Sequence, residues 1–188
     1  MQRGKLILIT GMSGSGKTTL ASYAGEHGYR ITTMGDVIRG LASERGLEPT
    51  PCNLALIAEG IRREGGEAAV AEKCIEKLKR EGLSKVAVDG IRSLDEVEAF
   101  RNAFGDTLLL ALYSSPSTRY LRLKKRGRSD DAGDMEVFHQ RDRRELGFGL
   151  GSAIAMADHM IINEGSLEDL KHAFNCLMER FEVWPESK

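Results

Sequence analysis

The sequence predicts a three-layer α/β/α fold, in which helices cover both faces of a sheet of about five parallel strands. Short apolar runs alternate with longer amphipathic segments along the whole chain of 188 residues. Strands that are separated in this way by helices pair in parallel through right-handed crossovers. Several runs, such as LILIT and LLLALY, are apolar without interruption, which is typical of central strands buried on both faces. The length fits a single domain over residues 1–188.

The expected strands are short runs of apolar or β-branched residues, bounded by polar or glycine-containing segments. They are Lys5–Thr10, Tyr29–Thr33, Lys85–Asp89, Thr107–Tyr113 and His159–Asn163. Ligands of open parallel sheets bind at the carboxyl ends of the strands. We therefore expect the functional residues at Gly11, at residues 34–36, at residues 89–92 and at Asn163.

Helices are expected between the strands, where apolar residues recur with a helical period. Gly28 is placed to end the first helix, and Pro116 is placed to open a later one. The stretch GFGLGSA, residues 147–153, is predicted to be a glycine-rich connector. The expected helices are Lys17–His27, Asp36–Arg45, Asn53–Arg63, Glu67–Arg80, Leu94–Phe104, the segment from Pro116 that carries RYLRLKKR, Met135–Leu146 and Ser166–Arg180.

The composition is that of an ordinary globular protein, with 41% hydrophobic residues, 29% charged residues and a formal net charge of −1. The global charge therefore gives no argument for nucleic acid or a membrane surface as a partner. No apolar run approaches the roughly 18 residues that cross a bilayer, and the N-terminus lacks a signal-peptide cleavage pattern, so we expect a cytoplasmic protein. The three cysteines are widely spaced, which supports neither a disulfide framework nor a zinc site.

The segment GMSGSGKT, Gly11–Thr18, matches the phosphate-binding pattern G-x-x-x-x-G-K-[ST]. Its glycines let the backbone curl so that several N–H groups point at phosphate oxygens. Lys17 is expected to reach the β- and γ-phosphates, and the Thr18 hydroxyl is expected to bind Mg²⁺. The predicted nucleotide-binding residues of this phosphate loop are Gly11, Ser13, Gly14, Ser15, Gly16, Lys17, Thr18 and Thr19. The predicted cofactor is ATP with Mg²⁺, and GTP stays open as the donor.

Charged residues also follow the second and third expected strands. Asp89 ends the run KVAVD, and a carboxylate there can hold Mg²⁺ directly or through water. Arg39 in GDVIR and Arg92 in DGIRS come from separate loops, and such a pair can clamp a phosphate through forked hydrogen bonds. Asp36 lies beside Arg39 and is placed to orient either this arginine or a group of the acceptor. Taken singly, either arginine can also be a solvated residue at a helix start.

The order GMSGSGKT, TMGDVIR, VAVDGIRS and RLKKRGR resembles the nucleoside monophosphate kinases, adenylate kinase in particular. ADHMIINEGSLEDL is similar to the corresponding stretch of dephospho-CoA kinase, and the chain as a whole resembles a group of archaeal adenylate-kinase-related proteins. The resemblance implies a P-loop kinase fold and a small-molecule phosphorylated acceptor. It also implies catalytic roles for Lys17, Arg39, Asp89, Arg92 and Arg126.

Two segments outside the expected sheet have counterparts in these kinases. The mostly helical insertion 41–82 would form the cover over the acceptor, and residues 127–134 would form a short mobile lid. The basic run RYLRLKKRGR can also be a nucleic-acid patch or a solvated face, but the acidic residues that follow it argue against a nucleic-acid groove. Within the lid region and the helix after it, the candidates for stabilising the transferred phosphoryl group are Arg126, Arg128, Arg141 and Arg144.

The donor base is expected to lie between Arg122 and the loop that starts at Asn163. The resemblance matches Arg122 to the arginine that stacks on the donor base, and it implies backbone contacts to the base from the loop. Asn163 is also compatible with a simple turn, in which Ser166 caps the next helix and Asp169 completes a capping box.

Two positions depart from the adenylate kinase pattern. Met34 stands where those kinases have a threonine, and Glu96 stands where they have the glutamine that reads the adenine edge. An ionised carboxylate accepts hydrogen bonds and donates none, so it suits a cytosine or guanine amino group better than adenine. Glu96 is therefore either a base contact or an exposed helix residue, and AMP is not the default acceptor.

The leading hypothesis is a kinase that moves the ATP γ-phosphate to a nucleotide-like phosphorylated acceptor, with dephospho-CoA kinase as an alternative. The competing class is a P-loop ATPase or a regulatory nucleotide switch. A switch GTPase would carry an N-K-x-D motif to read guanine, and the sequence contains none. Acceptor identity and oligomeric state stay open at the level of sequence.

Overall fold

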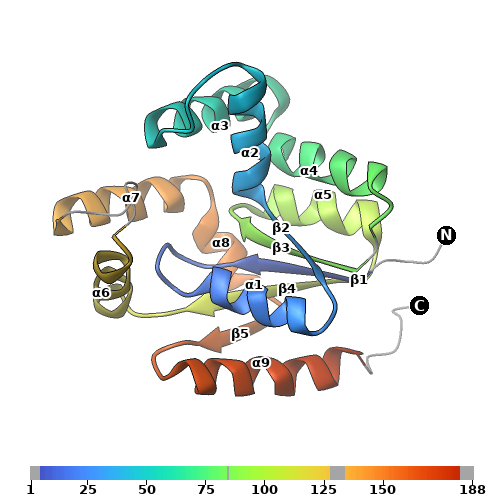
Figure 1. The fold of residues 1–188 in the computed structure, drawn as a ribbon, viewed down its shortest axis with the longest axis vertical. Coiled ribbons are helices and arrows are strands. Elements are labelled where there is room, and N and C mark those ends of the chain that lie inside the picture. Colours follow the sequence, from blue (N-terminus) through green and yellow to red (C-terminus); the bar gives the residue numbers. More distant parts are fainter. Residues whose placement is uncertain (1–4, 84, 128–133, 183–188) are drawn as a thin grey trace.

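The computed structural model describes residues 5–83, 85–127 and 134–182 (Figure 1). Its centre is one parallel sheet with the strand order β2-β3-β1-β4-β5. The strands are β1 (Lys5–Thr10), β2 (Arg30–Thr33), β3 (Lys85–Ile91), β4 (Thr107–Tyr113) and β5 (His159–Ile162). The expected five-stranded parallel sheet is therefore confirmed, with strand bounds that differ from expectation by at most two residues.

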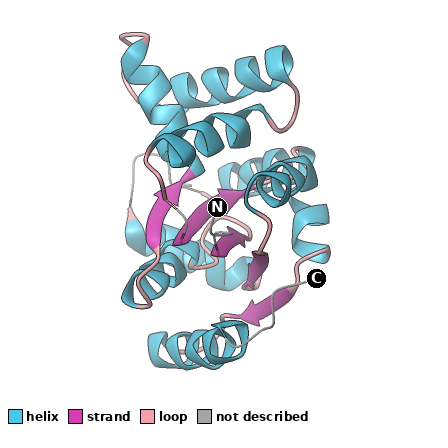
Figure 2. Cartoon of the chain, turned by 90° about the vertical axis from the view of Figure 1, so that its right-hand side faces the viewer, coloured by secondary structure: helices cyan, strands magenta, loops and turns pink. Residues whose placement is uncertain are grey.

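Helices pack on both faces of the sheet, which makes three layers (Figures 1 and 2). One face is covered by α1 (Lys17–Glu26) and α9 (Leu167–Glu182). The other face is covered by α4 (Ala69–Arg80), α5 (Leu94–Phe104) and α8 (Leu150–Ala155). Four further helices, α2 (Met34–Glu44), α3 (Pro51–Gly65), α6 (Pro116–Arg126) and α7 (Met135–Gly147), lie toward the carboxyl ends of the strands.

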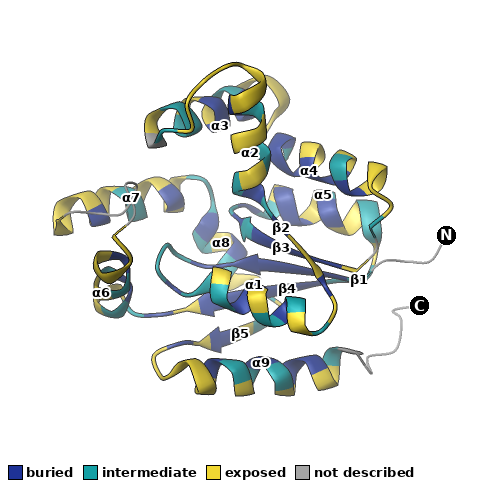
Figure 3. Cartoon of the chain, viewed as in Figure 1, coloured by how far each residue is buried: buried dark blue, intermediate teal, exposed yellow. Residues whose placement is uncertain are grey.

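The alternation of side chains along β1 explains the two helix layers. Leu6 and Leu8 belong to the core under α4 and α5, whereas Ile7 and Ile9 belong to the core under α1 and α9. All four side chains are fully buried because successive residues of a strand point to opposite faces. Figure 3 shows the same contrast, with a buried sheet and helices whose outer faces are exposed. The apolar runs in the sequence thus correspond to the central strands.

Side-chain caps set most helix starts. The Thr33 hydroxyl accepts a hydrogen bond from the backbone N–H of Asp36, so α2 begins at Met34, two residues before its expected start. Ser166 and Asp169 exchange side-chain and backbone hydrogen bonds at the start of α9, which confirms the expected capping box. Capping therefore explains why α2 begins earlier than expected.

The expected connector over residues 147–153 is wrong, because its second half forms the start of α8. Gly149 adopts a left-handed conformation with φ of 90°, which ends the preceding turn and lets a new helix begin. Leu150 and Ala153 are then buried one helical turn apart. Their burial stabilises a helix that the glycine-rich composition does not favour.

The predicted insertion 41–82 contains the end of α2, then α3 and α4. Its apolar residues join the same core as β1 and β3 through Ala58, Ile61 and Leu78. In the described part of the chain, no helix is both long enough and apolar enough to cross a membrane.

Candidate nucleotide-binding site

The phosphate loop lies between β1 and α1, at the carboxyl edge of the sheet. Gly14 has a φ of +84°, and a Cβ there would come within 2.8 Å of the Arg119 carbonyl oxygen. Gly16 has a φ of +101°, and its added Cβ would lie 2.5 Å from Nδ2 of Asn163. Only glycine fits both the backbone conformation and the space at these two positions. The glycines are thus needed for the shape of the loop.

Lys17 folds back over this loop. Its Nζ donates hydrogen bonds to the carbonyl oxygens of Gly11 at 2.8 Å and Met12 at 3.1 Å. Burial holds the pKa of Lys17 below its ordinary value, and the nearby charge of Arg92 acts in the same direction, while Asp89 opposes it. A bound anion would favour the charged form of Lys17, because it would compensate the hydration that burial removes.

Thr18, in the first turn of α1, meets Asp89 near the end of β3. Asp89 is paired in register with Ile9 at the end of β1, and the Thr18 hydroxyl donates to its Oδ2 at 3.2 Å. Asp89 is 7% exposed, and its Oδ1 is buried without a hydrogen-bond partner among the described residues. Burial raises the pKa of the Asp89 carboxyl above its ordinary value. A buried carboxylate oxygen without a partner beside a hydroxyl fits a hard divalent cation such as Mg²⁺.

The remaining ligands of such a cation would have to be phosphate oxygens and water. No cluster of three or more His, Cys, Asp or Glu side chains that could hold a metal occurs among the residues described. Mg²⁺ commonly keeps several waters and binds through one or two protein groups together with substrate phosphates. The pair of Thr18 and Asp89 matches that mode of binding rather than a permanent metal centre.

Arg92 extends from the end of β3 toward α7. Its Nε donates to Oε2 of Glu145 at 3.1 Å, and Glu145 is 7% exposed. Burial by itself would raise the pKa of Glu145, but Arg92, Lys17 and Arg141 together hold it below its ordinary value. Glu145 is thus an ionised carboxylate that lies among the cations of the site.

Glu145 is a site residue that the sequence analysis missed. It lies in α7, a helix so rich in charge that no single carboxylate stands out in the sequence. The i, i+4 spacing from Arg141 is the only local signal, since it places both side chains on one helical face. Arg141 itself is half-buried, and its charge acts on Lys17 and Glu145.

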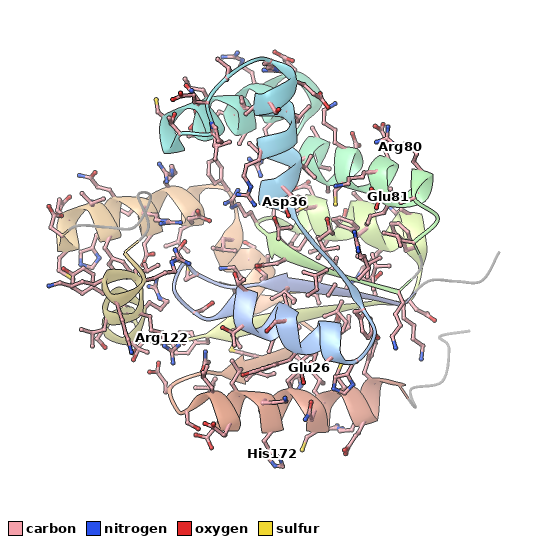
Figure 4. The ribbon with its side chains drawn as sticks, viewed as in Figure 1. Glu26, Asp36, Arg80, Glu81, Arg122 and His172 are labelled. Atoms are coloured by element: carbon pink, nitrogen blue, oxygen red, sulfur yellow. The ribbon has the colours of Figure 1, made fainter. Side chains whose placement is uncertain are left out.

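Arg39 lies on α2 and is paired within its own helix. Its Nη2 donates to Oδ1 of Asp36 at 2.5 Å, and both side chains are about half exposed, at 50% and 49%. Burial alone would raise the pKa of Asp36, but hydrogen bonds from Arg39 and Thr33 hold it below its ordinary value. Asp36 therefore orients Arg39, as expected, at the first turn of α2 (Figure 4).

Arg122, labelled in Figure 4, lies on α6 and bonds to the loop after β5. Arg122 Nη1 donates to the hydroxyl of Ser114 at 2.9 Å and to the Asn163 carbonyl oxygen at 3.0 Å. Asn163 is 5% exposed, and its Nδ2 donates to the Ser15 carbonyl oxygen at 2.8 Å. Asn163 is thus more than a turn residue, because its amide holds the phosphate loop in place.

Arg119 is the second residue that the sequence analysis missed. It is 3% exposed, and it donates to the carbonyl oxygens of Ser13 at 3.1 Å and Ser114 at 3.2 Å. Its guanidinium also forms two hydrogen bonds with the Asp142 carboxylate and lies 4.9 Å from the centre of the Phe138 ring. Arg119 therefore connects the phosphate loop to α7, although in the sequence it is one basic residue among several.

The other expected cations lie farther along α6 and α7. Arg126 ends α6 and is exposed, and Arg144 is exposed on α7, where its charge acts on Glu145. Arg128 and residues 128–133 of the predicted lid lie outside the described residues.

Both expectations for Glu96 are changed by the structure. Glu96 is 0% exposed, so an exposed helix residue is wrong. Its Oε1 accepts from Arg62 Nη2 at 2.9 Å, and its Oε2 accepts from the Arg92 backbone N–H at 2.8 Å. Each oxygen therefore has a partner within the protein, which argues against a base contact.

Met34, the other position that departs from the adenylate kinase pattern, is 2% exposed and belongs to the core, so its side chain packs inside the protein.

Comparison with known proteins shows the family. Residues 7–144 match the AAA domain family. The chain is 46% identical over 175 residues to a UPF0200 protein of Hyperthermus butylicus, covering 93% of this chain and 94% of that protein. It is 47% identical over 177 residues to the UPF0200 protein MJ1399 of Methanocaldococcus jannaschii, covering 93% and 89%. The chain therefore belongs to the UPF0200 family.

Solved structures show the same fold at low sequence identity. TT1252 from Thermus thermophilus has a TM-score of 0.67 at 20% identity and covers 98% of this chain and 100% of its own. Shikimate kinase from Acinetobacter baumannii has a TM-score of 0.58 at 16% identity and covers 97% of each chain. These likenesses confirm a P-loop kinase fold.

Proposed function

We propose that this UPF0200 protein is an ATP-dependent phosphotransferase that moves the γ-phosphate of ATP to a small phosphorylated acceptor, of the kind used by nucleoside monophosphate kinases. One observation carries the proposal. Cations from three separate segments converge beside the Thr18–Asp89 pair: the charges of Arg92 and Arg141 both act on Lys17, and Arg92 bonds to Glu145 at 3.1 Å. Such a convergence of cations and a hydroxyl–carboxylate pair suits two phosphate groups and one divalent cation.

The donor half of the proposed site is the phosphate loop. Backbone N–H groups of the loop and the Lys17 ammonium would bind the β- and γ-phosphates. Thr18 and Asp89 would hold Mg²⁺. When bound, this ion would neutralise part of the negative charge of the phosphates. The donor base would lie near Arg122, whose guanidinium is already oriented by its bonds to Ser114 and Asn163.

The acceptor half is formed by the loops after β2 and β3. Arg39 and Arg92 would bind the acceptor phosphate. Each guanidinium group is held by one carboxylate, Asp36 for Arg39 and Glu145 for Arg92, and each retains further N–H donors. The insertion 41–82 would cover the acceptor, and residues 127–134 would close over the donor. All of these parts would belong to one domain over residues 1–188.

Catalysis in this proposal consists of positioning and charge stabilisation. The bond from the γ-phosphorus to the bridging oxygen breaks, a bond to an acceptor oxygen forms, and ADP leaves with the electron pair. Lys17, Arg92 and Arg141 would stabilise the charge of the transferred group, together with Arg126 at the end of α6. A closed site would exclude water, so that ATP is not hydrolysed.

The experiment is a measurement of ADP release from ATP or GTP with a panel of acceptors. The panel contains ribonucleoside and deoxyribonucleoside monophosphates and dephospho-CoA, and the phosphorylated product is identified by mass spectrometry. We expect one class of acceptor to stimulate ADP release and to gain one phosphate. Steady ATP hydrolysis that no acceptor changes would instead support an ATPase or a regulatory switch. A response to dephospho-CoA alone would support dephospho-CoA kinase.

A further inference from the structure

Arg62 and Glu96 form a buried ion pair between the insertion and the body of the fold. Arg62 lies on α3 and is 7% exposed, and Glu96 lies on α5 and is 0% exposed. Arg62 Nη2 donates to Oε1 of Glu96 at 2.9 Å, and its guanidinium lies 5.0 Å from the centre of the Phe148 ring. Two buried charges need each other, because either one alone would lose its hydration without compensation. The insertion is thus fixed to α5 at this point.

The second oxygen of Glu96 holds the loop after β3. Oε2 accepts from the backbone N–H of Arg92 at 2.8 Å, and the Ser93 hydroxyl accepts from the Glu96 N–H at 3.2 Å. The Arg92 side chain then donates to Glu145 on α7 at 3.1 Å. A continuous series of contacts therefore runs from α3 through Glu96 and Arg92 to α7.

We infer that Glu96 is a positioning residue. It fixes the backbone position of Arg92, and through Arg62 it makes the position of this proposed phosphate-binding arginine depend on how α3 packs against α5. The inference rests on the proposed function for the role of Arg92 and deepens it on the acceptor side. The hydrogen bond to Oε2 restrains the Arg92 backbone, and the charge of Arg62 keeps Glu96 in the position that makes this bond. Disturbing either residue of the pair should release Arg92 without touching the phosphate loop.

The same contacts indicate which part of the acceptor determines the specificity of the site. Because each carboxylate oxygen of Glu96 bonds to the protein, this side chain contributes to acceptor binding through Arg92 rather than through a nucleobase. Specificity on this side of the site would then come from the acceptor's phosphate. Loss of Glu96 should weaken the binding of any phosphate monoester by a similar factor, whatever group the phosphate carries.

The first test measures Arg92 directly in the full chain. Glu96→Gln and Arg62→Met are compared with wild type by NMR, which follows solvent exchange of the Arg92 Nε–H in the absence of nucleotide. We expect exchange to become at least about tenfold faster in both variants, because the bond to Glu145 loses its fixed geometry. Unchanged exchange in a folded Glu96→Gln variant would overturn the inference.

A matched control is available on the same arginine. Oε2 of Glu67 lies 3.9 Å from Nε of Arg62, but the Glu67 side chain is 58% exposed. Glu67→Gln removes a carboxylate from Arg62 and leaves the buried pair intact, so Arg92 exchange should stay at the wild-type rate. Where a single variant fails to fold, Arg62→Met combined with Glu96→Met replaces the pair by apolar side chains and still removes the acceptor for the Arg92 N–H.

The second test measures function with a defined probe. Inorganic phosphate is titrated into protein that is saturated with Mg²⁺ and the non-hydrolysable analogue adenylyl imidodiphosphate. We expect Glu96→Gln to bind phosphate about tenfold more weakly and the analogue within about twofold of wild type. Equal phosphate affinities would overturn the inference and leave the proposed function in place. Absence of phosphate binding in wild type, with Arg92 exchange still dependent on Glu96, would instead count against the proposed acceptor site.

Discussion

The phosphate loop takes its shape from residues that are neighbours in the sequence, whereas the acceptor side is assembled from α2, α3, α5 and α7. The loop is shaped by glycines in the left-handed conformation and by hydrogen bonds from Lys17 to Gly11 and Met12, which all lie within a few residues of one another in the chain. On the acceptor side, the bonds that matter join Arg62 to Glu96 and Arg92 to Glu145, across 34 and 53 positions of the chain. A local motif can therefore reveal the donor half of such a site, while the acceptor half depends on packing.

The donor half is nevertheless supported from outside by Arg119, and removing that support should have the largest effect. Arg119→Met leaves the Asp142 carboxylate without its partner and two carbonyl oxygens without a donor. Breaking a buried ion pair in this way costs about 3–5 kcal/mol of unfolding free energy. Chemical denaturation monitored by circular dichroism measures the loss.

Arg143→Met is the control for Arg119. Arg143 lies on α7 and pairs with Glu136 at 3.2 Å, but the two side chains are 68% and 66% exposed. We expect a change within about 1 kcal/mol. Equal losses in the two variants would mean that Arg119 does not brace the phosphate loop.

The second prediction concerns Lys17 within the loop. Lys17→Met should lower the rate of phosphoryl transfer by about 10²–10³-fold, because one preorganised donor to the transferred group is lost. The fold should be unchanged, since the sheet and its two cores do not depend on this side chain. Single-turnover transfer from labelled ATP gives the rate. Lys171→Met, a surface variant on α9 beside Glu26, should keep full activity, and a similar loss there would point to a non-specific effect.

The third prediction tests whether the two halves are separable. Arg39→Ala should lower kcat/KM for the acceptor by about tenfold and leave ATP affinity intact, because Arg39 lies on α2 and, among the described residues, bonds within that helix and to Thr33. Kinetics at varied acceptor concentration, with ATP binding by calorimetry, distinguish the two effects. Arg45→Ala, at the exposed end of the same helix, serves as the control. Lost ATP affinity in Arg39→Ala would contradict the division of the site.

The smallest expected effect is a pH dependence of ATP binding. Burial holds the pKa of Lys17 below its ordinary value in the nucleotide-free protein, and bound phosphates would raise it. Binding should therefore take up protons, and affinity should fall as the pH rises above the pKa of the free protein. Calorimetry in two buffers of different ionisation enthalpy measures the uptake. Lys17→Met should abolish the uptake, whereas proton release in wild type would contradict the sign.

Sequence reasoning was sufficient where the physical cause is local. Strand alternation, the cap at Ser166 and the phosphate loop all follow from residues that are close in the chain. The α8 helix was missed because its stability comes from burial of Leu150 and Ala153 against elements distant in sequence. Propensity alone could not supply that contact.

By itself, the sequence determined the five strands, most of the helices between them and the nucleotide-binding loop, because periodicity, glycine conformations and a contiguous motif act at short range. Only the tertiary structure decided the surroundings of Glu96, Glu145 and Arg119. A carboxylate or guanidinium in a helix looks the same in the sequence whether it faces water or a buried partner. Such a side chain is buried only where packing brings an opposite charge within hydrogen-bond distance. For Glu96 that charge comes from Arg62 on α3.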